Sequence, residues 1–134
     1  QIEPEAKIVV MGDLNDNPDD DSVFKHLGAK GNRESVQPGE LYNPGYKIYK
    51  SGTGSLGYQD VWCLYDQVMV SHAWLDRSNL TNLTFWKAEI FNKDFLKEES
   101  GKRKGYPLRT HSGGVWTNGY SDHFPSLIWV VKAK

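Results

Sequence analysis

The sequence has a single cysteine, Cys63, among its 134 residues. One thiol cannot form a disulfide within the chain or build a cluster of cysteine metal ligands, so the fold must depend on its hydrophobic core. Long hydrophobic runs are also missing. The longest run, residues 127–131, is far shorter than the roughly 18 residues that a membrane helix needs. These absences exclude a disulfide-stapled domain and a membrane-spanning helix, and they predict a soluble domain or part of one.

Neither sign of charge dominates, because 16 Lys and Arg residues stand against 17 Asp and Glu residues, for a net charge of −1. A non-specific nucleic-acid binder carries a broad basic surface, so any phosphate ligand of this chain needs local cations or a metal ion. Residues 1–7 also lack the basic and apolar stretches of a targeting segment. The compartment is therefore open, with secretion or a periplasmic location expected only if a signal peptide precedes the chain.

Glycine is frequent, with 13 residues, and aromatic residues make up 13% of the chain, which favours strands and turns over helical bundles. Apolar runs predict strands at residues 7–11, 61–71, 83–91 and 127–131. Asn17, as an N-cap, and Pro18, at the first helical position, predict a helix that ends at Gly28 or Gly31. The chain is therefore expected to be mostly β, with a helix after its first strand.

Two long segments rich in Gly, Pro, Asn and Ser, residues 31–57 and 100–120, are expected to be loops. We expect a short strand at residues 46–49 within the first loop and a helical turn at residues 93–99 before the second. The second loop holds the basic cluster 102–104 and Arg109. Loops of this length often carry function.

The first candidate site is Gly12-Asp13-Leu14-Asn15-Asp16, which directly follows a buried strand. This position places Asp13 and Asn15 at the end of the strand, where side chains can face a ligand. A polar turn that also caps the helix is the alternative. A calcium loop is excluded, because Pro18 stands where that loop requires Gly and Phe24 where it requires Glu.

Asp66 is the second candidate, because the strand period of two sets it among apolar residues. Its predicted face carries Trp62, Leu64, Val68 and Val70. A carboxylate in such surroundings loses hydration, so it must find a partner or become protonated. A buried salt bridge to Arg or Lys is the structural alternative to a functional role.

The third candidate is Ser121-Asp122-His123-Phe124-Pro125, immediately before the last predicted strand. Taken alone it could be an ordinary strand-entry loop. If the first and last strands run antiparallel, however, this motif and the Asp13 motif lie at one sheet edge. Acidic oxygens that hold a hard cation, an imidazole and nearby basic side chains would then suit the hydrolysis of a phosphoester.

The three motifs, in this order, resemble those of the endonuclease/exonuclease/phosphatase superfamily, the metal-dependent phosphoesterases of the deoxyribonuclease I type. The resemblance rests on Gly12-Asp13-Leu14-Asn15, on Trp62 with Asp66 four residues later, and on Ser121-Asp122-His123. It implies an α/β (α+β) fold, namely half of a two-sheet sandwich that is mainly antiparallel. The family's domain is roughly twice this length. We therefore expect residues 1–134 to be its C-terminal half, without the N-terminal Asn and principal metal-binding Glu.

The resemblance also implies catalytic roles for four side chains. Asp13 would orient or deprotonate the attacking water, and Asn15 would hydrogen-bond the scissile phosphate. His123 would bind the phosphate or act as a general acid or base. Asp66 would hold the other ring nitrogen of His123, which would explain an acid on an apolar face.

The cofactor implied by the resemblance is Mg²⁺ or Mn²⁺, with Asp122 as a metal ligand or as a partner of a metal-bound water. Tyr106 and Arg109, in the loop before Ser121, are candidate substrate contacts that no family motif fixes. The expected substrate is a phosphoester, and the sequence leaves open nucleic acid, a nucleotide, an inositol phosphate or a lipid headgroup. Phosphodiesterase, nuclease and phosphatase activities therefore all stay open.

Half of such a site should turn over little by itself. With one sheet lacking its opposing layer, strands 83–91 and 127–131 should stay partly exposed, so we expect self-association. A non-catalytic module, for example a glycan binder built from the five Trp and seven Tyr residues, is the competing interpretation. A scaffold that has lost catalysis is a third.

Overall fold

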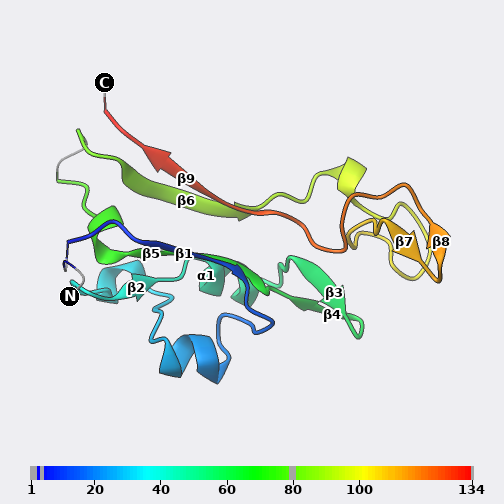
Figure 1. Cartoon of the computed structure of the whole chain (residues 1–134), viewed down its shortest axis with the longest axis horizontal. Coiled ribbons are helices and arrows are strands. Elements are labelled where there is room, and N and C mark those ends of the chain that lie inside the picture. The colour runs from blue at the N-terminus through cyan, green and yellow to red at the C-terminus, as the bar shows by residue number, and fades with distance from the viewer. Residues whose placement is uncertain (1–2, 4, 79–80, 134) are drawn as a thin grey trace.

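The computed structural model describes residues 3, 5–78 and 81–133 and contains two β-sheets that lie face to face (Figure 1). The first sheet has the order β1 (Val9–Asp13), β5 (Asp66–Ser71) and β2 (Leu41–Tyr42). The second pairs β6 (Thr84–Ile90) with β9 (Ser126–Val131). Within the described residues, every pair of strands is antiparallel. The expected α/β, mainly antiparallel fold is confirmed.

Two small hairpins and several short helical segments complete the fold. The hairpins pair β3 (Leu56–Tyr58) with β4 (Val61–Cys63), and β7 (His111–Ser112) with β8 (Val115–Trp116). The helical segments are a π-helix at Ser22–His26, α1 at Gly45–Lys50, and 3₁₀ turns at Arg33–Ser35, His72–Trp74 and Asp94–Leu96. None of the described helices is long and apolar enough to cross a bilayer.

Strand β5 is buried on both of its faces, and this burial determines how the layers pack. Met69 packs with Val23 below the first sheet, whereas Val70 packs with Phe85 of β6 between the sheets. Met69 and Val70 are both completely buried, as expected for neighbours on a central strand with both faces covered. The expectation of a sheet without an opposing layer is therefore wrong for this inner face, because β6 and β9 cover it.

The outer face of the second sheet is open, as expected for strands 83–91 and 127–131. Trp86 on β6 is 53% exposed and Trp129 on β9 is 46% exposed. The Lys87 ammonium lies 5.2 Å from the centre of each indole ring, so the three side chains form one surface group. The strand predictions at these positions are confirmed to within a residue or two.

The predicted strand at residues 61–71 is wrong as a single element, because β4 ends at Cys63 and β5 begins at Asp66. The backbone amide of Leu64 donates instead to the Asn17 side chain, at 2.9 Å. The carbonyl of Tyr65 accepts from the amide of Leu14, also at 2.9 Å. The chain therefore leaves one hairpin and enters the other sheet at this point, and Asp66 is the first residue of its strand.

One strand prediction and one helix prediction also need correction. Residues 46–49 belong to α1 and not to a strand, because Pro44 is the N-cap and the Asn43 side chain accepts a hydrogen bond from the Gly45 amide. The helix after β1 begins only at Ser22 and is a single π-helical segment. Asn17 does not cap it, since its side-chain oxygen bonds to Leu64. The loop 100–120 also contains the β7–β8 hairpin. The sequence did not predict this hairpin, because strands of two residues are too short to show an apolar pattern.

Candidate active site

The site forms where β1 ends and β5 begins. Asp13 is the last residue of β1 and Asp66 is the first of β5, and the two are cross-strand partners in the antiparallel register. Directly opposed residues in such a pair have their β-carbons about 5 Å apart on the same face. Two carboxylates at this spacing repel each other, so the position favours a positively charged partner.

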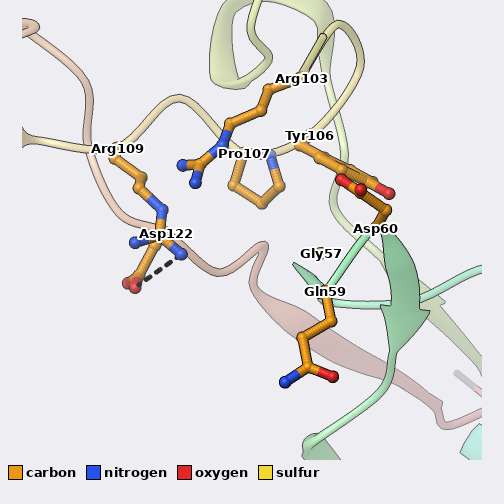
Figure 2. A pocket seen from close by; sticks show the side chains of 8 residues that line it. All are labelled: Gly57, Gln59, Asp60, Arg103, Tyr106, Pro107, Arg109 and Asp122. Atoms are coloured by element: carbon orange, nitrogen blue, oxygen red, sulfur yellow. Dashed lines mark ion pairs between the residues drawn. The ribbon is translucent and has the colours of Figure 1, made fainter. Parts of the chain in front are cut away.

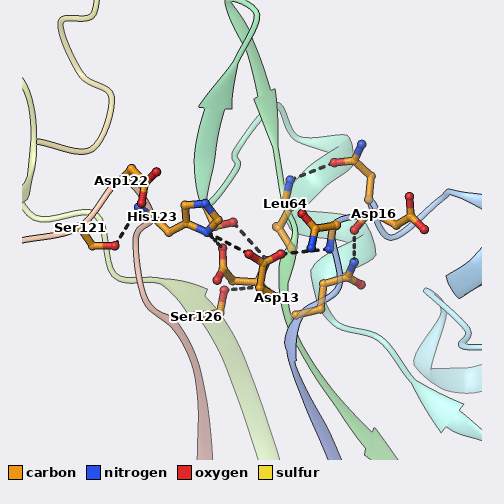
Figure 3. A network of polar contacts seen from close by, with 12 residues as sticks. Asp13, Asp16, Leu64, Ser121, Asp122, His123 and Ser126 are labelled. Carbon is orange, nitrogen blue, oxygen red and sulfur yellow. Dashed lines mark hydrogen bonds and ion pairs between the residues drawn. The ribbon is translucent and has the colours of Figure 1, made fainter. Parts of the chain in front are cut away.

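The imidazole of His123 faces the two carboxylates from the second layer (Figure 3). Its Nδ1 lies 2.7 Å from Asp66 Oδ2 and 3.8 Å from Asp13 Oδ2. The imidazole and the Asp66 carboxyl group are 22% and 25% exposed, so this contact is partly shielded from water. Asp66 therefore contacts a ring nitrogen of His123, as the resemblance implies, and among the described residues it forms no ion pair with Arg or Lys. The catalytic roles of the two side chains stay a prediction.

The packing of the two sheets creates this contact. Phe124, next to His123, is 1% exposed and packs with Leu64 and Ile90 between the layers. Ser126, at the start of β9, donates its hydroxyl hydrogen to the carbonyl of Asp66. The prediction of one shared sheet edge is wrong, because β1 and β9 belong to different sheets. Their ends still meet, since the layers pack face to face.

The contact with Asp66 determines which nitrogen of His123 faces a ligand. An ionised Asp66 can only accept, so Nδ1 carries the hydrogen in this contact. Within the described part of the chain, Nε2 has no hydrogen-bond partner. The arrangement therefore holds the imidazole in the tautomer with the hydrogen on Nδ1 and leaves Nε2 free to accept a proton; only after it has accepted one can Nε2 donate to a phosphate oxygen.

Asn15 is presented by a tight turn built on Asp13. The Asn15 amide donates to Asp13 Oδ1 at 3.0 Å, and Asn15 adopts a left-handed backbone conformation with φ of 53°. Asn tolerates this conformation better than most residues. The Asn15 side chain is exposed beside the carboxylate of Asp13. One turn therefore sets an acid and an amide side by side, as the spacing of the motif predicts.

A hard cation fits the two carboxylates. Asp13, Asp66 and His123 each offer one ligand atom within 4.8 Å of the others. Among the described residues, these three form a cluster of acidic and histidine side chains that could hold a metal ion. Mg²⁺ binds through one or two carboxylates and keeps its other positions for water and phosphate. His123 Nδ1 already bonds to Asp66, so oxygen ligation by Asp13 and Asp66 is the better fit.

Asp122 does not join this cluster. Its Oδ2 lies 3.7 Å from Nη2 of Arg109, and the two side chains are 52% and 38% exposed. Arg109 and Tyr106 line one pocket with Asp122 (Figure 2). The structure therefore brings both candidate substrate contacts next to the His123 motif. The role of Asp122 as a metal ligand stays a prediction.

Sequence reasoning missed a buried polar relay behind the site. The Asn43 side-chain nitrogen donates to Gln67 Oε1 at 2.7 Å, and Gln67 Nε2 donates to the carbonyl of Asp16 at 2.6 Å. Asn43 and Gln67 are 0% and 1% exposed. Through these two hydrogen bonds, Asn43 and Gln67 fix the loop that follows Asp13. A polar residue inside the apolar strand β5 was the available signal for Gln67, whereas nothing local marks Asn43.

The aromatic residues do not form a single platform. Trp62 is half-buried and packs against Phe124, with ring centres 6.1 Å apart, and Tyr106 packs edge-on against it. Trp129 is exposed, but its neighbour on the surface is Lys87. Among the described residues, these aromatic side chains therefore do not form the exposed row that a glycan-binding surface would need.

One comparison with known proteins gives a match. A family model described as the Endonuclease/Exonuclease/phosphatase family matches residues 1–132, which include all three motifs. No curated protein and no solved structure matches the chain.

Proposed function

Because the chain belongs to the endonuclease/exonuclease/phosphatase family, we propose that it carries the C-terminal half of the active site of a metal-dependent phosphoester hydrolase. The family supports a phosphoesterase type of activity in general. The observation that carries the proposal is the contact of His123 Nδ1 with Asp66 Oδ2 at 2.7 Å, with Asp13 Oδ2 at 3.8 Å. Side chains from two sheets converge there on one small region.

In the proposed reaction, Asp13 orients a water molecule and accepts its proton as the water oxygen attacks phosphorus. The bond from phosphorus to the leaving oxygen then breaks, and the leaving group departs with the electron pair as an oxyanion that takes a proton from solvent. His123 donates a hydrogen bond from Nε2 to a non-bridging phosphate oxygen, and Asp66 stabilises the charged imidazolium through Nδ1. Asn15 donates its side-chain amide hydrogens to the same phosphate. Each step uses a group that lies at the ends of β1, β5 and β9.

Asp13 and Asp66 are the residues that would hold Mg²⁺ or Mn²⁺, because these ions prefer oxygen ligands and the two carboxylates lie close together. Such an ion, when bound, neutralises phosphate charge and polarises the phosphorus–oxygen bond. Tyr106 and Arg109 are proposed to contact the substrate beside this centre. The residues on which this proposal depends are all present, which disfavours a scaffold that has lost catalysis.

The test is hydrolysis of bis(p-nitrophenyl) phosphate by the full-length protein with added Mg²⁺. His123→Ala and Asp13→Ala should each lower kcat by about 10²–10⁴, the range for loss of a positioned acid–base group. Matched controls are His26→Ala, an exposed histidine on the π-helix, and Asp94→Ala, an exposed carboxylate on a 3₁₀ turn. Full activity in either site variant contradicts the proposal, and so does an equal loss in the controls.

A further inference from the structure

We propose that the pocket beside His123 binds a second phosphate group of the substrate. The pocket has a volume of about 120 Å³ and lies between the β3–β4 turn and the loop that precedes Ser121. It is lined by Gly57, Gln59, Asp60, Arg103, Tyr106, Pro107, Arg109 and Asp122. We call it the arginine pocket. The proposal rests on the proposed function, because it concerns a substrate whose first phosphate lies at His123.

Charge is the first argument. Figure 2 shows the guanidinium groups of Arg103 and Arg109 both directed into the pocket. Arg103 forms no ion pair with any residue that the structure describes, and Arg109 reaches Asp122 only at 3.7 Å, too far for a hydrogen bond. Of these two guanidinium groups, only that of Arg109 has a carboxylate partner, and that partner is loosely held. Two planar guanidinium groups match the oxygens of a phosphate group.

The other acid of the pocket is already paired. Asp60 lies 2.9 Å from the Lys102 ammonium group, which stands outside the pocket lining. Because Lys102 neutralises Asp60, the pocket keeps the two positive charges of its arginines against the one negative charge of Asp122. The pocket therefore has one uncompensated positive charge, although the whole chain has a net charge of −1. The excess is local, and an anion would balance it.

The pocket is also preorganised. The Tyr106 amide donates to the carbonyl of Arg103 at 2.9 Å, so Arg103 opens a hydrogen-bonded turn. The Tyr106 ring packs edge-on against Trp62, with centres 4.7 Å apart. It also covers Gly57, where an added Cβ would lie 2.8 Å from the ring. A site whose walls are set before binding loses less entropy on binding than a mobile loop does.

Position relates the pocket to the reaction. Asp122 is a wall of the pocket and His123 is the next residue, so the pocket and the proposed catalytic histidine are neighbours along the chain. The His123 amide donates to Ser121 Oγ at 3.1 Å, which helps to fix this short segment. The ligand we infer would place one phosphate group at His123 and the other in the arginine pocket.

The carboxylate of Asp122 favours a compact ligand over a polymer. It stands on the wall of the pocket, 3.7 Å from Arg109, where it would repel the further phosphates of an extended nucleic acid. A single phosphate would meet two guanidinium groups and this one loosely held carboxylate. The ligand class we infer is a small phosphoester that carries a second phosphate.

The test uses two ligands that differ in one phosphate: propyl phosphate and 1,3-propanediol bisphosphate. Isothermal titration of the full-length protein should give a Kd about tenfold lower for the bisphosphate, which corresponds to one added charge-assisted contact. Arg103→Gln should abolish this preference and leave the Kd of propyl phosphate unchanged. The matched control is Lys104→Gln, which removes a neighbouring charge outside the pocket lining and should keep the preference.

Three outcomes overturn the proposal: equal wild-type affinity for both ligands, equal weakening of both by Arg103→Gln, or the same loss in Lys104→Gln. A short single-stranded oligonucleotide that depends on Arg103 as strongly as the bisphosphate does would overturn the assignment to a compact ligand. The titration needs no turnover. If hydrolysis fails while the Arg103-dependent preference persists, the proposed function is wrong and the arginine pocket stands.

Discussion

Gln67→Met is the substitution that most directly tests the buried relay. Methionine has a similar length and shape but neither donates nor accepts the two hydrogen bonds that Gln67 makes. Those bonds, at 2.7 Å from Asn43 and at 2.6 Å to the Asp16 carbonyl, span the space between α1, β5 and the loop after Asp13. The change therefore removes polar contacts while it largely preserves packing.

The magnitude follows from the burial of the two partners. Asn43 is fully buried, so its side-chain nitrogen loses its partner and cannot reach water. A buried group left unsatisfied costs about 1–3 kcal/mol. Asp16 is only half-buried, so a water molecule can replace part of its lost bond. We expect the free energy of unfolding to fall by about 2–4 kcal/mol in total.

Equilibrium unfolding in urea measures this loss, with Gln37→Met as the matched control. Gln37 is exposed, and its side chain makes no hydrogen bond with the residues that the structure describes, so the same substitution there should change stability by less than about 0.5 kcal/mol. If Gln67→Met and Gln37→Met have the same unfolding midpoint and slope, the relay does not stabilise the fold and the reasoning is refuted.

Three further predictions use other parts of the molecule. Gly57→Ala should cost about 1–3 kcal/mol in urea unfolding, because its new Cβ would lie 2.8 Å from the Tyr106 ring; an unchanged midpoint would show that the ring moves freely. A hydrogen bond with the Cys63 side chain, together with burial, raises the pKa of Tyr65 to about 12 from 10.0. The folded state therefore keeps the Tyr65 proton longer than the unfolded state, so stability present below pH 10.0 should be lost progressively up to about pH 12, and less steeply in Cys63→Ala. The chain by itself should self-associate through the exposed surface around Trp129; light scattering that shows a monomer at high concentration, or no change in Trp129→Lys, contradicts this.

Local chemistry was enough to single out Asp66, because a carboxylate among apolar neighbours needs a partner. It did not identify that partner: the family resemblance pointed to His123, whose Nδ1 lies 2.7 Å from Asp66 Oδ2. The strand β9 was predictable because residues 127–131 form a continuous apolar run, and β6 because its segment is rich in residues that favour strands. The prediction at residues 46–49 failed, since a tyrosine-rich segment suits a strand until Pro44 and the buried Asn43 start a helix.

The sequence by itself therefore predicted which side chains would gather at the candidate site, and it predicted a mainly antiparallel fold. Only the tertiary structure decided that two different sheets bring Asp13 and His123 together, that Asp122 lies with Arg109, and that Gln67 supports the loop from below. The physical reason is range. Strand periodicity and the cost of burying a charge act on neighbouring residues, whereas the meeting of β1 with the residues before β9 depends on the packing of layers formed by distant parts of the chain.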